Sequence, residues 1–188
     1  HLQDSLCLKE QVREDGYSYA LTHRMRWAKG LDTDALIKAV ERLDSGHDIL
    51  RMGFRAGCMG YIRAPSGVTI RELDLSGLPH ADVMAQVAIQ RDRMASEPYQ
   101  LDSDPLYRLL LIKLPNGEHE LLINFHHLIM DCFCSFDYSK MLLDEYRKSM
   151  DSAEAAAPDY VPQYKSFVER QNARLTEERK QVLTTYWS

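Results

Sequence analysis

The chain has 188 residues, of which 45% are hydrophobic, and a formal net charge of -5 at pH 7. This length and composition suit one domain, or one large lobe of something bigger, with a sizeable core. The interspersed acidic and basic residues argue against a nucleic-acid partner, and no apolar run is long enough to span a membrane.

Apolar spacing in the first half predicts a mixture of helices and strands. It predicts a short helix over Leu2–Arg13, and the alternation of apolar and polar residues predicts a half-buried strand over Tyr17–Trp27. Asp32 or Thr33 can cap the next helix, whose apolar stripe runs to Leu43. The further elements expected before residue 100 are strands over 49–54 and 68–75, a hairpin-like region around 61–62, and a helix that begins at Pro79.

The second half contains a predicted hairpin. A strand over Leu106–Leu114 leads into Pro115-Asn116-Gly117-Glu118, a strong tight-turn sequence. The run Leu121–Phe125, with polar Asn124 as its interruption, then predicts a largely buried strand. Beyond it we expect a helix over 133–150, a surface loop over 151–162, and two charged amphipathic helices over 164–175 and 177–187. These elements predict the α/β class, with a mixed or largely antiparallel sheet and helices packed on it.

Two adjacent histidines, His126 and His127, follow the buried run, and Asp131 precedes the next helix. Because neighbouring side chains on a strand point to opposite faces, one imidazole can face a cleft while the other packs into the fold. An imidazole that acts as a base needs a fixed tautomer and a substrate proton within hydrogen-bond reach. Asp131 can supply that order, pair with a cation, or cap the helix.

Other roles stay open for these residues. Strand-terminal histidines are often satisfied core residues. A metal site is disfavoured, because His126 and His127 cannot easily turn to the same face and no spaced Cys or His pair completes a tetrahedron. Cys132 beside a histidine would be a nucleophile if its thiol pKa were depressed, but nothing nearby marks such a depression.

The four cysteines, Cys7, Cys58, Cys132 and Cys134, include no pair with CxxC spacing. Because the chain is large enough to fold without covalent links, we expect four reduced thiols in a cytoplasmic protein. The chain starts at His1 with neither an initiator Met nor a signal peptide, so we also expect it to be part of a longer polypeptide. Phosphate-binding glycine loops and a nucleophile elbow are absent from the sequence.

The order of several motifs resembles the condensation domains of nonribosomal peptide synthetases. Residues 126–131, His-His-Leu-Ile-Met-Asp, match the HHxxxD core of the HHxxxDG motif, and residues 45–54 resemble the upstream RHExLRTxF motif. The opening 2–6, the helix start 31–36, and the stretches 97–101 and 105–108 resemble further family segments. The resemblance therefore covers nearly the whole chain.

The resemblance implies a V-shaped pair of lobes, each a two-layer sandwich like chloramphenicol acetyltransferase, with the active site between them. This chain matches the N-terminal subdomain, over residues 1–188, so we expect the isolated lobe to be inactive. The intact domain would form an amide bond between carrier-bound acyl or peptidyl and aminoacyl thioesters. Its implied partners are donor and acceptor carrier proteins, whose phosphopantetheine arms tether the substrates, the C-terminal subdomain and an adenylation domain. No directly bound cofactor or metal is implied.

The resemblance also implies roles for single residues. His127 would be the catalytic histidine, His126 would support the loop, and Asp131 would pair with Arg51. Two positions depart from the family pattern. Cys132 replaces the motif glycine and would lie close to the substrate path, and Gly46 stands where the upstream motif has an arginine.

Two other functions stay open. A stand-alone acyltransferase that uses coenzyme A thioesters shares the fold and the HxxxD logic. A docking or recruitment module would keep the fold without catalysis, and Gly46 and Cys132 favour that hypothesis.

Overall fold

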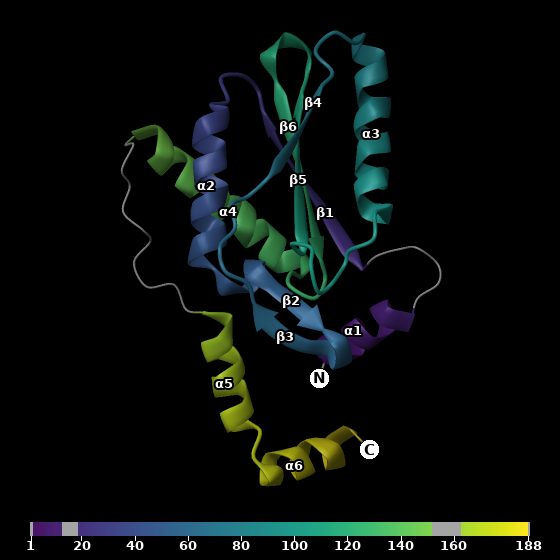
Figure 1. The fold of residues 1–188 in the computed structure, drawn as a ribbon, viewed down its shortest axis with the longest axis vertical. Helices are drawn as coiled ribbons and strands as arrows, with labels where there is room; N and C mark the ends of the chain where they lie inside the picture. Colours follow the sequence, from purple (N-terminus) through teal and green to yellow (C-terminus); the bar gives the residue numbers. More distant parts are fainter. Residues whose placement is uncertain (1, 13–18, 152–162, 188) are drawn as a thin grey trace.

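A four-stranded sheet forms the centre of the fold (Figure 1). The computed structural model describes residues 2–12, 19–151 and 163–187. The strand order is β1 (Ala20–Trp27), β6 (His119–His126), β5 (Tyr107–Lys113) and β4 (Ile70–Asp74). β6 runs antiparallel to both β1 and β5, whereas β4 runs parallel to β5. The predicted α/β class with a mixed, largely antiparallel sheet is therefore confirmed.

The β5–β6 hairpin forms where the turn sequence predicts it. Asn116 and Gly117 have φ angles of 65° and 74°, which these two residue types tolerate better than others. The Leu114 amide donates to the Glu118 carbonyl at 2.8 Å and closes the turn. The resulting register gives odd-numbered residues of β6 to one face of the sheet and even-numbered residues to the other.

Helices α2 (Thr33–Gly46) and α4 (Cys132–Asp151) pack on one face of the sheet. Asp32 caps α2, since its carboxylate accepts from the Ala35 amide at 2.9 Å. The main buried cluster combines these helices with odd-numbered strand residues, including Leu36, Val40, Leu109, Ile123, Phe125, Tyr138 and Leu142. The packing of helices on this mixed sheet agrees with the fold that the resemblance implies.

Helix α3 (His80–Ser96) covers the opposite face of the sheet. Pro79 immediately precedes this helix as its capping residue rather than opening it. A second buried cluster joins its apolar side chains to even-numbered strand residues, namely Val83, Val87, Met94, Leu110, Ile112 and Leu122. β5 and β6 are therefore buried on both faces, which explains their continuous apolar sequences.

A small hairpin of β2 (Met52–Arg55) and β3 (Met59–Ile62) lies outside the main sheet. The predicted strand over 49–54 is wrong at its start, because residues 48–51 form the 3-10 turn η1 (Asp48–Arg51). The Leu50 amide closes this turn on the His47 carbonyl. The turn brings the Asp48 carboxylate to the start of helix α5 (Tyr164–Arg174), where it accepts from the Tyr164 amide at 2.7 Å.

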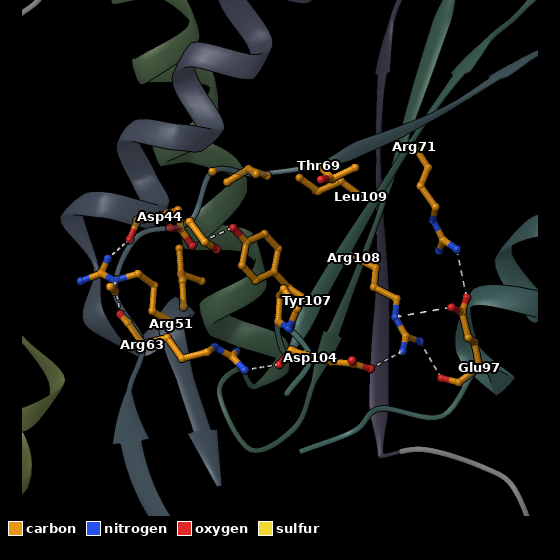
Figure 2. A pocket seen from close by; sticks show the side chains of 16 residues that line it. Asp44, Arg51, Arg63, Thr69, Arg71, Glu97, Asp104, Tyr107, Arg108 and Leu109 are labelled. Carbon is orange, nitrogen blue, oxygen red and sulfur yellow. Dashed lines mark hydrogen bonds and ion pairs between the residues drawn. The ribbon is translucent and has the colours of Figure 1, made fainter. Parts of the chain in front are cut away.

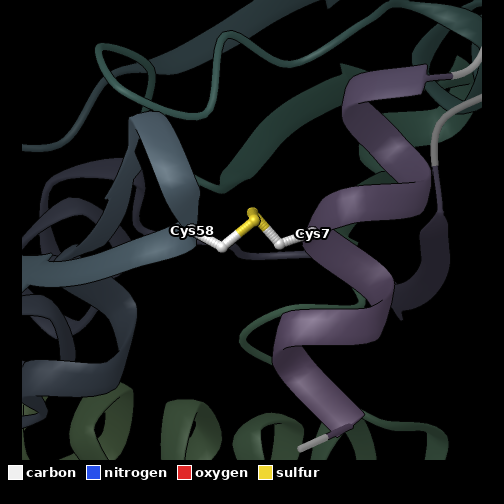
Figure 3. The surroundings of a disulfide bond; sticks show 2 residues. All are labelled: Cys7 and Cys58. Atoms are coloured by element: carbon white, nitrogen blue, oxygen red, sulfur yellow. A yellow bond between two sulfur atoms is a disulfide. The ribbon is translucent and has the colours of Figure 1, made fainter.

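A disulfide between Cys7 and Cys58 joins helix α1 (Leu2–Val12) to the turn η2 (Ala56–Cys58) of the small hairpin (Figure 3). This bond corrects the expectation of four reduced thiols, because folding brings the two Cα atoms to 5.9 Å across a separation of 51 positions. Cys132 and Cys134 are free and exposed.

The last two helices, α5 (Tyr164–Arg174) and α6 (Glu177–Trp187), form where predicted and extend away from the sheet (Figure 1). Of the predicted loop over 151–162, Asp151 is instead the last residue of α4, and residues 152–162 lie outside the described residues. Residues 13–18, which include the predicted start of the first strand, and the terminal residues 1 and 188 also lie outside them. Among the helices that are described, none combines the length and apolar character needed to cross a membrane.

Candidate active site

The end of β6 separates the two neighbouring histidines. His126 is the last residue of the strand and is fully buried, whereas His127, in the following turn, is partly exposed. The two neighbours differ in burial as expected, but because the strand ends at His126 and not because they point to opposite faces of one strand. We call residues 126–131 the histidine loop.

The contacts of His126 define its tautomer. Its Nδ1 atom accepts from the Leu128 amide at 3.0 Å, so the neutral ring carries its proton on Nε2. Nε2 faces the Glu10 carboxylate at 3.5 Å. Burial lowers the pKa of His126, and the nearby Glu10 charge opposes this effect. The His126 ring also packs edge-to-face with the Tyr99 ring, with ring centroids 5.5 Å apart.

Backbone contacts hold His127 at the start of the loop. Its amide donates to the Tyr19 carbonyl at 2.6 Å, and the Ile129 amide donates back to the His126 carbonyl at 3.0 Å. The imidazole of His127 is thus attached to a hydrogen-bonded turn while it remains partly exposed. A partly exposed imidazole on a fixed backbone can exchange a proton with a bound substrate.

Asp131 caps helix α4. Its carboxylate accepts from the Cys134 amide at 2.7 Å, and its carbonyl accepts from the Ser135 amide at 3.1 Å. The hydrogen bonds from Cys134 lower the pKa of Asp131, and the charge of His127 adds a smaller contribution in the same direction. Of the roles that the sequence leaves open for Asp131, the structure shows the helix cap.

Arg51 lies elsewhere and does not pair with Asp131, so the pairing implied by the resemblance is wrong in this structure. Its guanidinium donates to three backbone carbonyls, those of Arg63 at 3.1 Å, Ser45 at 3.0 Å and Asp44. The physical reason is that each group finds closer partners. Arg51 donates to carbonyls at the end of α2, and the Asp131 carboxylate accepts from an amide in the first turn of α4.

Cys132 begins helix α4 immediately after Asp131 and is exposed with a free thiol. The next residue, Phe133, has 83% of its surface exposed. The start of α4 therefore presents a thiol and an aromatic ring beside the histidine loop. Within the described residues, His, Cys, Asp and Glu side chains form no group of three or more that could hold a metal ion.

A cavity of about 480 Å³ is lined in part by Arg51 (Figure 2). Its charged walls come from α2, η1, β4, β5 and the segments next to β3, α3 and β5, and they include Asp44, Arg51, Arg63, Arg71, Glu97, Asp104 and Arg108. Arg71 and Arg108 both bind Glu97, and Arg108 also pairs with Asp104 at 3.6 Å. Because these arginines already have acidic or carbonyl partners, their charges are paired within the cavity wall itself. The histidine loop does not line it.

Sequence reasoning missed the side chains that support the loop. Glu10 lies on α1, far along the chain, and Tyr99 lies in the connection from α3. The Tyr99 hydroxyl donates to the Asn124 side chain at 2.6 Å, and the Asn124 amide donates to Thr22 at 2.9 Å. Asn124, the polar interruption in a buried strand, was the one signal that a polar partner would have to be present.

Comparisons with known proteins agree with this arrangement. The chain is 29% identical over 194 residues to cyclosporin synthetase simA from Tolypocladium inflatum, and the match covers 98% of this chain and 1% of that protein. It is 26% identical over 188 residues to phosphinothricin tripeptide synthetase PhsC from Streptomyces viridochromogenes, covering 98% of this chain and 17% of the relative.

The fold also matches the crystal structure of the starter condensation domain of the rhizomide synthetase RzmA. The TM-score is 0.83 at 18% sequence identity, and the match covers 96% of this chain and 46% of that structure. This chain thus spans less than half of that structure and a smaller share of the two synthetases. The family profile described as Condensation domain matches residues 1–188, and the chain therefore belongs to the condensation-domain family.

Proposed function

We propose that residues 1–188 are the N-terminal subdomain of a condensation domain in a nonribosomal peptide synthetase, which forms an amide bond between two carrier-bound thioesters. The observation that carries this proposal is the position of His127. It is partly exposed directly after β6, while the neighbouring His126 is buried and the turn that carries His127 is hydrogen-bonded.

In the proposed reaction, the amine nitrogen of the acceptor attacks the carbonyl carbon of the donor thioester. A C–N bond forms and the C–S bond breaks, and the released thiolate takes up the proton that the amine loses. His127 would accept that proton, or would position the amine and donate to the developing oxyanion. The phosphopantetheine arms of the donor and acceptor carrier proteins would tether both substrates, without a further bound cofactor or metal.

We further propose that a C-terminal subdomain and a neighbouring adenylation domain complete the machinery. The small share of each synthetase that this chain covers supports a multidomain setting. The isolated subdomain would be inactive, because the second wall of the site would be missing. We place the protein in the cytoplasm, a compartment in which a disulfide such as Cys7–Cys58 is unusual. Measuring whether Cys7 and Cys58 are reduced in rapidly quenched cells tests that placement, since reduced thiols agree with it and an intact disulfide argues against it.

A second function, a docking or recruitment module without catalysis, is favoured by one observation. Cys132 puts an exposed side chain where the family motif has glycine, directly after the histidine loop. The two functions differ in whether the site turns over substrate.

The deciding experiment measures amide formation by the intact domain with loaded carrier proteins, for wild type, His127→Ala and Cys132→Gly. Catalysis predicts product from wild type and Cys132→Gly, and loss of product from His127→Ala. An unchanged rate in His127→Ala would remove that residue from the mechanism. Product from Cys132→Gly alone would show that the cysteine closes the site, and the docking function would then be preferred.

A further inference from the structure

Helix α1 contacts the histidine loop through two polar side chains, Gln3 and Glu10. We infer that Glu10 is a positioning residue which, together with Gln3, fixes the turn that carries His127. The catalytic consequence rests on the proposed function, but the positioning itself does not.

The contact between Glu10 and His126 sets the direction of a buried ring. The Glu10 side chain has 12% of its surface exposed, and the His126 side chain has none. At 3.5 Å the contact is longer than an ideal hydrogen bond, yet among the described residues Nε2 has no partner at hydrogen-bond distance. Glu10 is thus the acceptor group that this buried N–H faces. An alternative ring orientation would turn Nδ1 away from the Leu128 amide.

The second oxygen of Glu10 extends the effect to His127. It accepts from the Tyr19 amide at 3.4 Å, and the Tyr19 carbonyl accepts from the His127 amide at 2.6 Å. The Glu10 carboxylate therefore contacts both the His126 ring and the backbone of Tyr19, the residue whose carbonyl binds the His127 amide. Both connections reach the same turn from the α1 side.

Gln3 holds the next residue of the loop. Its Nε2 atom donates to the Leu128 carbonyl at 2.7 Å, and its Oε1 atom accepts from the Tyr164 hydroxyl at 2.8 Å. The Leu128 amide binds the His126 ring. The Leu128 carbonyl thus binds the Gln3 side chain of α1, and the Leu128 amide binds the His126 ring, which faces Glu10 of α1.

The position of α1 is itself fixed. Cys7 lies between the two contacts along the helix, is fully buried and is bonded to Cys58 (Figure 3). A helix attached in this way can transmit a defined position to the loop, because side-chain contacts are effective only when their backbone does not move. Removal of the Glu10 carboxylate should therefore loosen the turn without unfolding the sheet.

The test compares Glu10→Ala, the conservative Glu10→Gln and the matched control Lys9→Ala in the intact domain. Lys9 is the exposed neighbour on the same helix. We expect Glu10→Ala to speed amide hydrogen exchange at residues 127–128 about tenfold, the effect of losing one hydrogen bond to a buried group. Exchange in β5 should match wild type. For amide formation, kcat should fall about 10- to 100-fold with KM for the loaded carriers unchanged.

Glu10→Gln keeps one oxygen acceptor but puts an NH2 donor in place of the second oxygen, so it should restore exchange and kcat only in part, between Glu10→Ala and wild type. Lys9→Ala should resemble wild type in both. Equal acceleration of exchange throughout the loop and β5, or no change at 127–128, would overturn the inference. If wild type forms no amide, the proposed function fails, but the exchange result still decides whether Glu10 fixes the turn.

Should Glu10→Ala not fold, Gln3→Glu removes the donor to Leu128 and keeps an acceptor for Tyr164. It should speed exchange at Ile129 and Leu128 alone, and wild-type exchange there would contradict the inference.

Discussion

The Asp131 carboxylate accepts a hydrogen bond from the Cys134 amide at 2.7 Å. The motif aspartate therefore acts within its own helix and not across the site toward Arg51. This local role explains why Asp131 is exposed and yet has a lowered pKa. It also separates two kinds of substitution, since a helix cap needs an oxygen acceptor whereas an ion pair needs a charge.

Replacement of Asp131 should distinguish the cap from an ion pair. Asp131→Ala should lower the free energy of unfolding by about 1 kcal/mol, because the α4 amide loses its side-chain acceptor. Asp131→Asn keeps an acceptor oxygen and should lie within a few tenths of a kcal/mol of wild type. Urea unfolding of both variants measures the difference. If Asn is as harmful as Ala, the charge matters and the cap is not the main role.

Arg51 should contribute to stability through its carbonyl contacts. Arg51→Ala leaves the carbonyls of Asp44, Ser45 and Arg63 without this donor and should cost about 1.5–3 kcal/mol, the range for charged hydrogen bonds. Arg51→Lys keeps the charge but cannot reproduce the planar set of donors, so it should recover little. Thermal unfolding of the two variants provides the measurement. Full recovery by Lys would point to a simple charge interaction.

The buried His126 should make stability depend on pH. Its folded pKa lies below the value of about 6.5 for an unfolded chain, so below that pH the unfolded state binds a proton that the folded state does not. Stability should therefore fall as pH drops from 7 toward the folded pKa, by at most about 1.4 kcal/mol per pH unit. In His126→Asn this part of the slope should vanish. Unfolding curves at pH 7, 6 and 5 for both proteins test the sign, and equal slopes would contradict it.

The Cys7–Cys58 disulfide closes a long segment and should stabilise the fold. A chain-entropy estimate for a loop of this length gives about 4 kcal/mol, and native disulfides commonly contribute about 2–4 kcal/mol. The double variant Cys7→Ser/Cys58→Ser should lose this amount under oxidising conditions. A dithiol reductant should destabilise wild type to a similar level and leave the variant unchanged. Cys132→Ser/Cys134→Ser is the matched control and should have little effect. Four titratable thiols in unreduced, denatured protein would show that the bond does not form.

The sequence by itself determined the features that depend on neighbouring residues. Asp32, one of the two candidate caps, begins α2, Asn116-Gly117 closes the β5–β6 turn, and the apolar run of β6 ends at two histidines. The cap and the turn follow from backbone preference, and the burial of the β6 run follows from its continuous apolar sequence, so a few adjacent positions contain the information. The ordered motifs added the family, which the comparison over residues 1–188 shows.

Only the tertiary structure decided which distant groups meet. Glu10 reaches His126, Cys7 reaches Cys58, and Arg51 turns to carbonyls at the end of α2 instead of Asp131. None of these pairs has a spacing that a helix or strand repeat would favour. They arise because packing on the sheet brings α1, the small hairpin and the histidine loop to one end of the molecule, where each buried polar group takes the nearest partner.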